Sequence, residues 1–231
     1  MNWLLVIVIA TLIFCSWRGR KKGFVKTAFT IFSTIIAILI TLWISPYVSK
    51  WIKSSDGLNE YVNRRVSENI TTDDVGDNIS EEVNYIEKMK VPSIIKDSLI
   101  KNKTPDVYEA MNVNTFKGYV VQLISTFIIS VAVFLAIWII VKIILSIIST
   151  TLDLVTSLPI IGDIDRIGGL LAGLVNGFLV IWIGLLLVTV FANTQLGQIL
   201  FLQINDSQFL SVIYNHNLIL IFLSNIGKVI F

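Results

Sequence analysis

Residues 118–141, GYVVQLISTFIISVAVFLAIWIIV, contain no charged side chain, and residues 27–49 and 167–205 are likewise uncharged. Each stretch exceeds the roughly 20 residues that a helix needs to cross a hydrocarbon core of about 30 Å. Only 15% of the 231 residues are charged, whereas about a quarter are charged in soluble domains. The sequence therefore predicts an all-α, polytopic membrane protein with about four transmembrane helices.

The first apolar segment, Trp3 to Cys15, is followed by its positive charges rather than preceded by them. A signal peptide has the opposite order, so we expect a retained first helix, short enough that a re-entrant segment is the alternative. A short basic turn over residues 18–26 then leads to a second helix, roughly Phe24 to Ile44, which should end at Ser45 and Pro46. The turn is expected to be anchored in the cytoplasm by Arg18, Arg20, Lys21 and Lys22, which places the N-terminus outside.

The remaining chain divides by composition into three parts. Residues 47–116 alternate charged and apolar side chains at helical spacing and predict an extracytoplasmic region of two to four short helices. Residues 117–192 predict the third and fourth transmembrane helices with a cytoplasmic connection over 142–167, where Lys142 anchors the third helix at the inner headgroups. Residues 193–231 predict one or two amphipathic, interfacial helices, with a fifth span within 209–231 as the alternative.

The segment LPIIGDIDRIGG, residues 158–169, gathers three charges, a proline and glycines at the expected mouth of the fourth helix. Adjacent residues on a helix do not face each other, so Asp165 and Arg166 should each find a partner elsewhere. Arg166 is expected near the inner interface. The motif residues of this cytoplasmic segment are Pro159, Gly162, Asp165 and Arg166.

Glycines recur on one face of the fourth helix at Gly169, Gly173 and Gly177, and the spacing predicts that Gly184 continues the face. Such small residues let two helix backbones approach closely in lipid. The stripe, a glycine zipper, is expected to pack on another helix of this chain, with a second subunit as the alternative.

These two blocks, the basic turn around Gly19 and Gly23 and the segment from Pro159 to Gly177, resemble the colicin V production protein family (CvpA) of bacterial inner membranes. The resemblance implies a role in producing and exporting a peptide toxin and in envelope integrity, with no established catalytic activity. Family members often carry an acidic residue near the start of the first helix, where this chain has Asn2.

Three function classes follow from these patterns. The first is an accessory or scaffold protein whose partners are the lipid bilayer and a homo-oligomer or an envelope or export complex. The second is a small oligomeric channel or transporter. The third, an enzyme, is disfavoured because Cys15 and His216 are the only residues of their types and no cofactor, metal or nucleic-acid motif is present.

Overall fold

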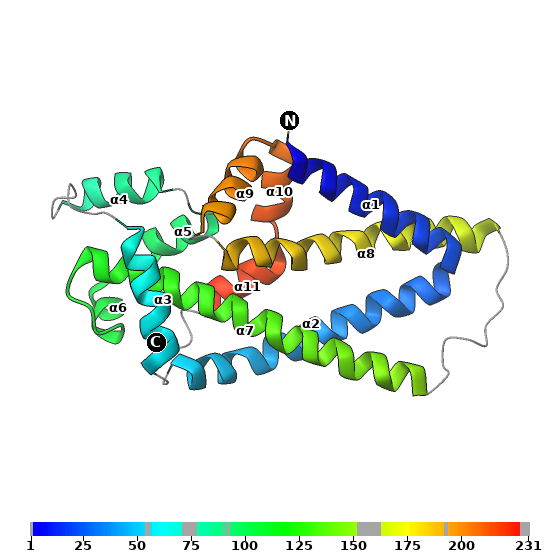
Figure 1. Cartoon of the computed structure of the whole chain (residues 1–231), viewed down its shortest axis with the longest axis horizontal. Helices are drawn as coiled ribbons and strands as arrows, with labels where there is room; N and C mark the ends of the chain where they lie inside the picture. Colours follow the sequence, from blue (N-terminus) through cyan, green and yellow to red (C-terminus); the bar gives the residue numbers. More distant parts are fainter. Residues whose placement is uncertain are drawn as a thin grey trace. The chain divides into compact units, whose positions relative to one another are not determined.

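The computed structural model describes residues 2–53, 56–70, 78–89, 91, 93–151, 163–191 and 194–226. Every regular element in these residues is a helix (Figure 1). The chain divides into two compact units, one of residues 1–44 and 134–185 and one of residues 45–133 and 186–231.

Four helices are long and apolar enough to cross a membrane: α1 (Trp3–Lys22), α2 (Phe24–Lys53), α7 (Phe116–Thr151) and α8 (Asp163–Val190). Many of their large apolar side chains are exposed, among them Phe14, Phe32, Ile140 and Val175. In water such surfaces would be costly, whereas lipid accepts them. The predicted all-α class with four transmembrane helices is confirmed, and the chain is a multi-pass membrane protein.

The first helix is longer than the sequence suggested. α1 has 20 residues, which gives about 30 Å of helix and spans a hydrocarbon core. It continues through Arg18, Arg20, Lys21 and Lys22, so the expected turn over residues 18–26 is reduced to a single break at Gly23. Basic side chains at a helix C-terminus interact favourably with the helix dipole, which explains why this segment stays helical.

The expected end of the second helix at Pro46 is wrong. α2 runs for 30 residues and contains Pro46 in its interior. Proline removes one backbone hydrogen bond but does not end a helix that its surroundings support, as membrane helices often show. The division between the two units falls between Ile44 and Ser45, next to this proline.

The boundaries of the third and fourth spans also differ from the expectation. α7 extends through Thr151, ten residues beyond Val141, and α8 already begins at Asp163. The expected connection over residues 142–167 is therefore helical at both ends. Its middle, which includes Pro159 and Gly162, lies outside the described residues.

The unit of residues 45–133 and 186–231 contains the short helices. The described part of the chain between α2 and α7 has four: α3 (Asp56–Glu68), α4 (Ile79–Lys88), α5 (Ser93–Lys101) and α6 (Pro105–Ala110). The buried Tyr119 ties α7 to α5, because its hydroxyl donates to the Leu99 carbonyl at 2.7 Å, and its ring stacks on that of Tyr108 from α6. The side of the membrane on which these helices lie stays a prediction.

In the described residues 194–226, three helices follow α8 instead of the expected one or two: α9 (Gln195–Asn205), α10 (Gln208–Asn215) and α11 (Leu218–Ile226). α9 packs on α10, and α11 packs on α5. Asn217 breaks the apolar run by capping α11, since its side-chain oxygen accepts from the amide of Ile219 at 3.1 Å. Within the described residues 209–226 the chain is thus two short helices, and neither is long enough to form the alternative fifth span.

Candidate functional site

The glycine stripe of α8 packs directly against α1 within one unit (Figure 1). A Cβ added at Gly169 would collide with the Gly19 carbonyl oxygen, and one added at Gly173 would lie 2.9 Å from the Cα of Ser16. Gly177 faces Leu12 and Cys15 one turn further. The contacts run in opposite sequence directions, so the two helices cross antiparallel with their backbones in contact. Dispersion attraction along such a close crossing holds helices together in lipid.

α1 contributes a glycine of its own to this contact, which the sequence reasoning did not assign to packing. A Cβ at Gly19 would lie 2.7 Å from the Cα of Gly173, so glycines face each other from both helices. The signal was present in the sequence, because Gly19 and Gly23 are spaced by four residues as the α8 glycines are. We call Gly19, Gly169, Gly173 and Gly177 the glycine crossing.

Gly184 does not belong to the glycine crossing, although its spacing predicted that it would. A Cβ added there would meet nothing within 4 Å. The close contact is confined to the end of α8 that contains Gly169 to Gly177, because two helices that cross at an angle keep their backbones in contact only near the crossing.

Asp165 joins the start of α2 to α8. Its Oδ1 accepts a hydrogen bond of 2.8 Å from the amide of Phe24, the first residue of α2. The residue before Phe24 is Gly23, whose φ of +83° suits glycine and closes the end of α1. An N-cap residue usually satisfies the first amides with its own side chain. Gly23 has none, and the carboxylate of Asp165 serves in its place.

The fit around Gly23 leaves no room for another residue. A Cβ there would run into the Asp165 carboxylate. The Gly23 carbonyl accepts from the Thr27 hydroxyl at 2.7 Å, and its amide donates to the Gly19 carbonyl at 2.9 Å. Gly168 of α8 is packed equally closely, since a Cβ there would lie 3.2 Å from the Phe24 side chain. One short segment therefore joins α1, α2 and α8.

Arg166 takes a different role from its neighbour Asp165. Its guanidinium lies 3.6 Å from Asp163 one turn earlier, and both side chains are largely exposed. Such an exposed ion pair contributes roughly 0–1 kcal/mol. The two other predicted motif residues, Pro159 and Gly162, lie outside the described residues.

The predicted anchors behave unequally. The ammonium of Lys21 sits 3.7 Å from the centre of the Trp17 ring, a cation–π contact near the end of α1. Lys142 does not simply extend along α7: its Nζ donates to the Thr34 hydroxyl of α2 at 3.0 Å. Asn2 caps α1, because its side-chain oxygen accepts from the Leu5 amide at 2.9 Å.

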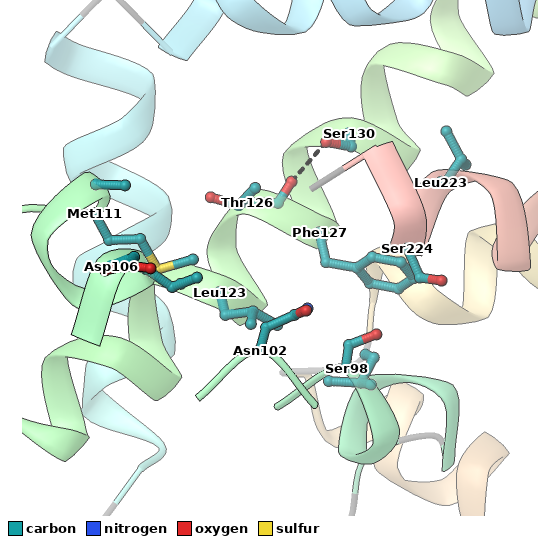
Figure 2. Close-up of a pocket in the computed structure, with 13 residues that line it drawn as sticks. Ser98, Asn102, Asp106, Met111, Leu123, Thr126, Phe127, Ser130, Leu223 and Ser224 are labelled. Atoms are coloured by element: carbon teal, nitrogen blue, oxygen red, sulfur yellow. Dashed lines mark hydrogen bonds between the residues drawn. The ribbon is translucent and has the colours of Figure 1, made fainter. Parts of the chain in front are cut away.

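A second site lies in the other unit, where the sequence reasoning expected none. A pocket of about 310 Å³ opens between α5, α6, α7 and α11 (Figure 2). Its walls come from residues more than 100 positions apart, such as Ile95 and Leu223. No local sequence pattern marks such a cavity.

In the part of the chain that the structure describes, no three side chains of His, Cys, Asp or Glu gather closely enough to hold a metal ion. Lys103, beside the pocket, forms an ion pair with Glu82 of α4, and burial lowers the pKa of its ammonium. The contact fastens α4 to the chain between α5 and α6.

Four helices able to span a membrane, two of them joined at a glycine crossing, define a small polytopic helical membrane protein. The model of one family, the colicin V production protein, matches residues 5–73 and 107–217. The chain belongs to this family. The match covers the glycine crossing and Asp165, and the whole of α3, α7, α9 and α10. Neither the curated proteins nor the solved structures contain a match to the chain.

Proposed function

We propose that this protein is a non-catalytic accessory or scaffold protein that supports production and export of a colicin V-type peptide toxin and maintenance of the cell envelope. Membership of the colicin V production family supports the first part of this role. The observation that carries the scaffold part is the junction of α1, α2 and α8. Backbone contact at Gly173 and the cap from Asp165 to Phe24 make a rigid element, which is suited to presenting surfaces rather than to turning over a substrate.

The proposed setting is the cytoplasmic membrane of a bacterium, with the N-terminus outside and the basic end of α1 in the cytoplasm. Arg18, Arg20, Lys21 and Lys22 support this orientation, because basic residues near short connections favour the cytoplasmic side. The proposed partners are the lipid bilayer and membrane proteins of an envelope or export complex, or further copies of this chain. The proposed function does not involve binding to nucleic acid.

The test is crosslinking with mass spectrometry in native membranes of a host that makes a colicin V-type toxin. The scaffold role predicts crosslinks to export or envelope proteins, and loss of toxin secretion when the gene is deleted. Gly173→Leu should fail to restore secretion, because it separates α1 from α8, whereas Gly184→Leu should restore it. Normal secretion without the protein, or no reproducible crosslinked partner, would contradict the proposal.

A small channel or transporter is the second candidate, and Lys142 is the observation that favours it. This lysine lies within the α7 span and bonds to Thr34 within the α2 span. Ionisable residues inside membrane helices often mark ion pathways. Ion flux into liposomes that contain the purified protein, reduced by Lys142→Met, would support a channel. Liposomes that stay closed at every applied potential would count against it.

A further inference from the structure

The pocket between α5, α6, α7 and α11 has the size and lining of a small-molecule site (Figure 2). Its volume of about 310 Å³ lies at the lower end of the range for ligand sites, roughly 300–1,000 Å³. A cavity of about 150 Å³ suffices for benzene. The pocket can therefore hold a compact molecule with a chain or ring of about eight to ten carbon atoms.

One part of the wall is apolar. It includes Phe127 and Leu123 from α7, Met111 after α6, and Leu223 from α11. Figure 2 shows the Phe127 ring among these elements, between the α7 ribbon and Ser224. Burying a hydrocarbon chain against such a wall is favourable by about 25 cal/mol per Å² of apolar surface. The pocket thus selects a ligand with an apolar body.

The α7 side of the pocket also carries hydroxyl groups, those of Thr126 and Ser130. Thr126 is 5% exposed and lines the pocket, and no hydrogen bond of its hydroxyl is present among the described residues. Ser130, one turn on, donates its own hydroxyl to the Thr126 carbonyl at 2.8 Å (Figure 2). The Thr126 hydroxyl is therefore free to donate or accept a hydrogen bond. A ligand in the pocket that brings a hydrogen-bonding group to it would gain that bond.

The charge of the site comes from one carboxylate. Among the described residues, Asp106 of α6 is the only ionisable one that lines the pocket, and it is exposed. The nearby Lys103 is already paired with Glu82. Across the described residues, Asp106 forms no ion pair. The pocket therefore attracts a cation and repels a carboxylate or phosphate.

We propose that this pocket binds a small amphipathic amine, with its hydrocarbon part against Phe127 and Leu123 and its ammonium group facing Asp106. The apolar wall and the Thr126 hydroxyl favour an amphipathic ligand, and the carboxylate of Asp106 favours an amine over fatty acids and other anionic amphipaths. The proposal concerns the unit of residues 45–133 and 186–231 and does not depend on the scaffold role.

The experiment uses the full-length protein in nanodiscs of zwitterionic lipid and an octylamine analogue that carries a photoreactive diazirine. Irradiation followed by mass spectrometry should locate the label on α5, α6, α7 or α11. Unlabelled octylamine should suppress this labelling about tenfold more effectively than octanoate of the same length, because Asp106 attracts one head group and repels the other.

Three variants test the assignment. Asp106→Asn should reduce the preference for octylamine over octanoate to about threefold or less. Ala110→Trp, which fills the pocket from an exposed position on α6, should abolish labelling there. Thr126→Val, which keeps the shape but removes the hydroxyl, should weaken labelling about threefold.

All three variants should keep the melting temperature of the parent protein, which separates loss of binding from loss of folding. Labelling spread evenly over the lipid-facing residues, or equal suppression by octylamine and octanoate, would overturn the proposal. Unchanged labelling of the pocket in Ala110→Trp would overturn it as well.

Discussion

At the scale of single residues, Asp165 performs a task that Gly23 cannot perform for its own helix. Gly23 has the φ of +83° that ends α1, and a residue with a capping side chain would be strained in that conformation. The carboxylate that replaces the missing cap lies 141 positions away in sequence. Gly23 thus reverses the chain direction, and Asp165 caps the helix that follows.

Removing this cap should destabilise the protein. Asp165→Ala leaves the Phe24 amide without its acceptor, and loss of an N-cap typically costs about 1 kcal/mol. We expect a lower midpoint in an unfolding titration with sodium dodecyl sulfate in mixed micelles.

The matched control for this substitution is Asp163→Ala. Both variants remove a negative charge from the first turn of α8, but Asp163 pairs only with Arg166 across an exposed surface. The difference between the two midpoints therefore isolates the hydrogen bond to α2. Equal midpoints for the two variants would show that Asp165 does not stabilise the start of α2.

At the scale of elements, the glycine crossing joins α1 to α8 over a limited length. Gly173 has backbone atoms of α1 directly opposite, whereas a side chain at Gly184 would meet open space. We expect Gly173→Leu to lower the free energy of unfolding by about 1–3 kcal/mol or more, because the leucine forces the backbones apart. Gly184→Leu should be nearly neutral. Similar losses for both variants, measured by thermal unfolding in detergent, would contradict the observed crossing.

A second link between elements joins α10 to the end of α8. The Tyr214 hydroxyl is fully buried and lies 2.7 Å from the Thr189 hydroxyl. Burial raises the pKa of the Tyr214 phenol well above its usual value near 10. A raised pKa in the folded state gives stability that is present below pH 10 and is lost as the pH rises beyond it.

The pH dependence of the Tyr214→Phe variant tests this link. At neutral pH the variant should be less stable by about 1 kcal/mol, because it loses one buried hydrogen bond. Above pH 10 the difference from the parent protein should shrink, since only the parent must keep a buried phenol protonated. Melting temperatures from pH 8 to 11 measure this. A constant difference across that range would show that Tyr214 ionises as freely in the folded protein as in the unfolded one.

At the scale of the whole molecule, the orientation in the membrane is the prediction with the widest consequences. It rests on the basic residues at the end of α1. In a Cys15→Ser background, a membrane-impermeant thiol reagent applied to intact cells should label a cysteine at position 109 on α6 and miss one at position 21. Both parent residues, Glu109 and Lys21, are exposed in the structure. Labelling of position 21 alone would reverse the orientation.

The class of the protein could be read from the sequence because it depends on composition along the chain. Uncharged runs as long as residues 118–141 can be accommodated only as membrane helices, whatever they pack against. The four spans, the all-α fold and the colicin V production family could therefore be predicted without a structure. The ends of the helices were harder to predict from the sequence. Pro46 and the basic residues after Trp17 are local stop signals, and the surrounding structure overrides them.

Only the tertiary structure decided which residues meet. The spacing of Gly169, Gly173 and Gly177 marked a packing face, but the partner helix and the exclusion of Gly184 depend on the angle at which α1 crosses α8. The cap from Asp165 to Phe24 and the pocket beneath Phe127 join segments that are distant in sequence. Hydropathy and periodicity describe one helix at a time, whereas a crossing, a shared cap or a cavity belongs to several helices at once. For that reason the sequence determined that this chain is a membrane protein, and the fold determined where its sites are.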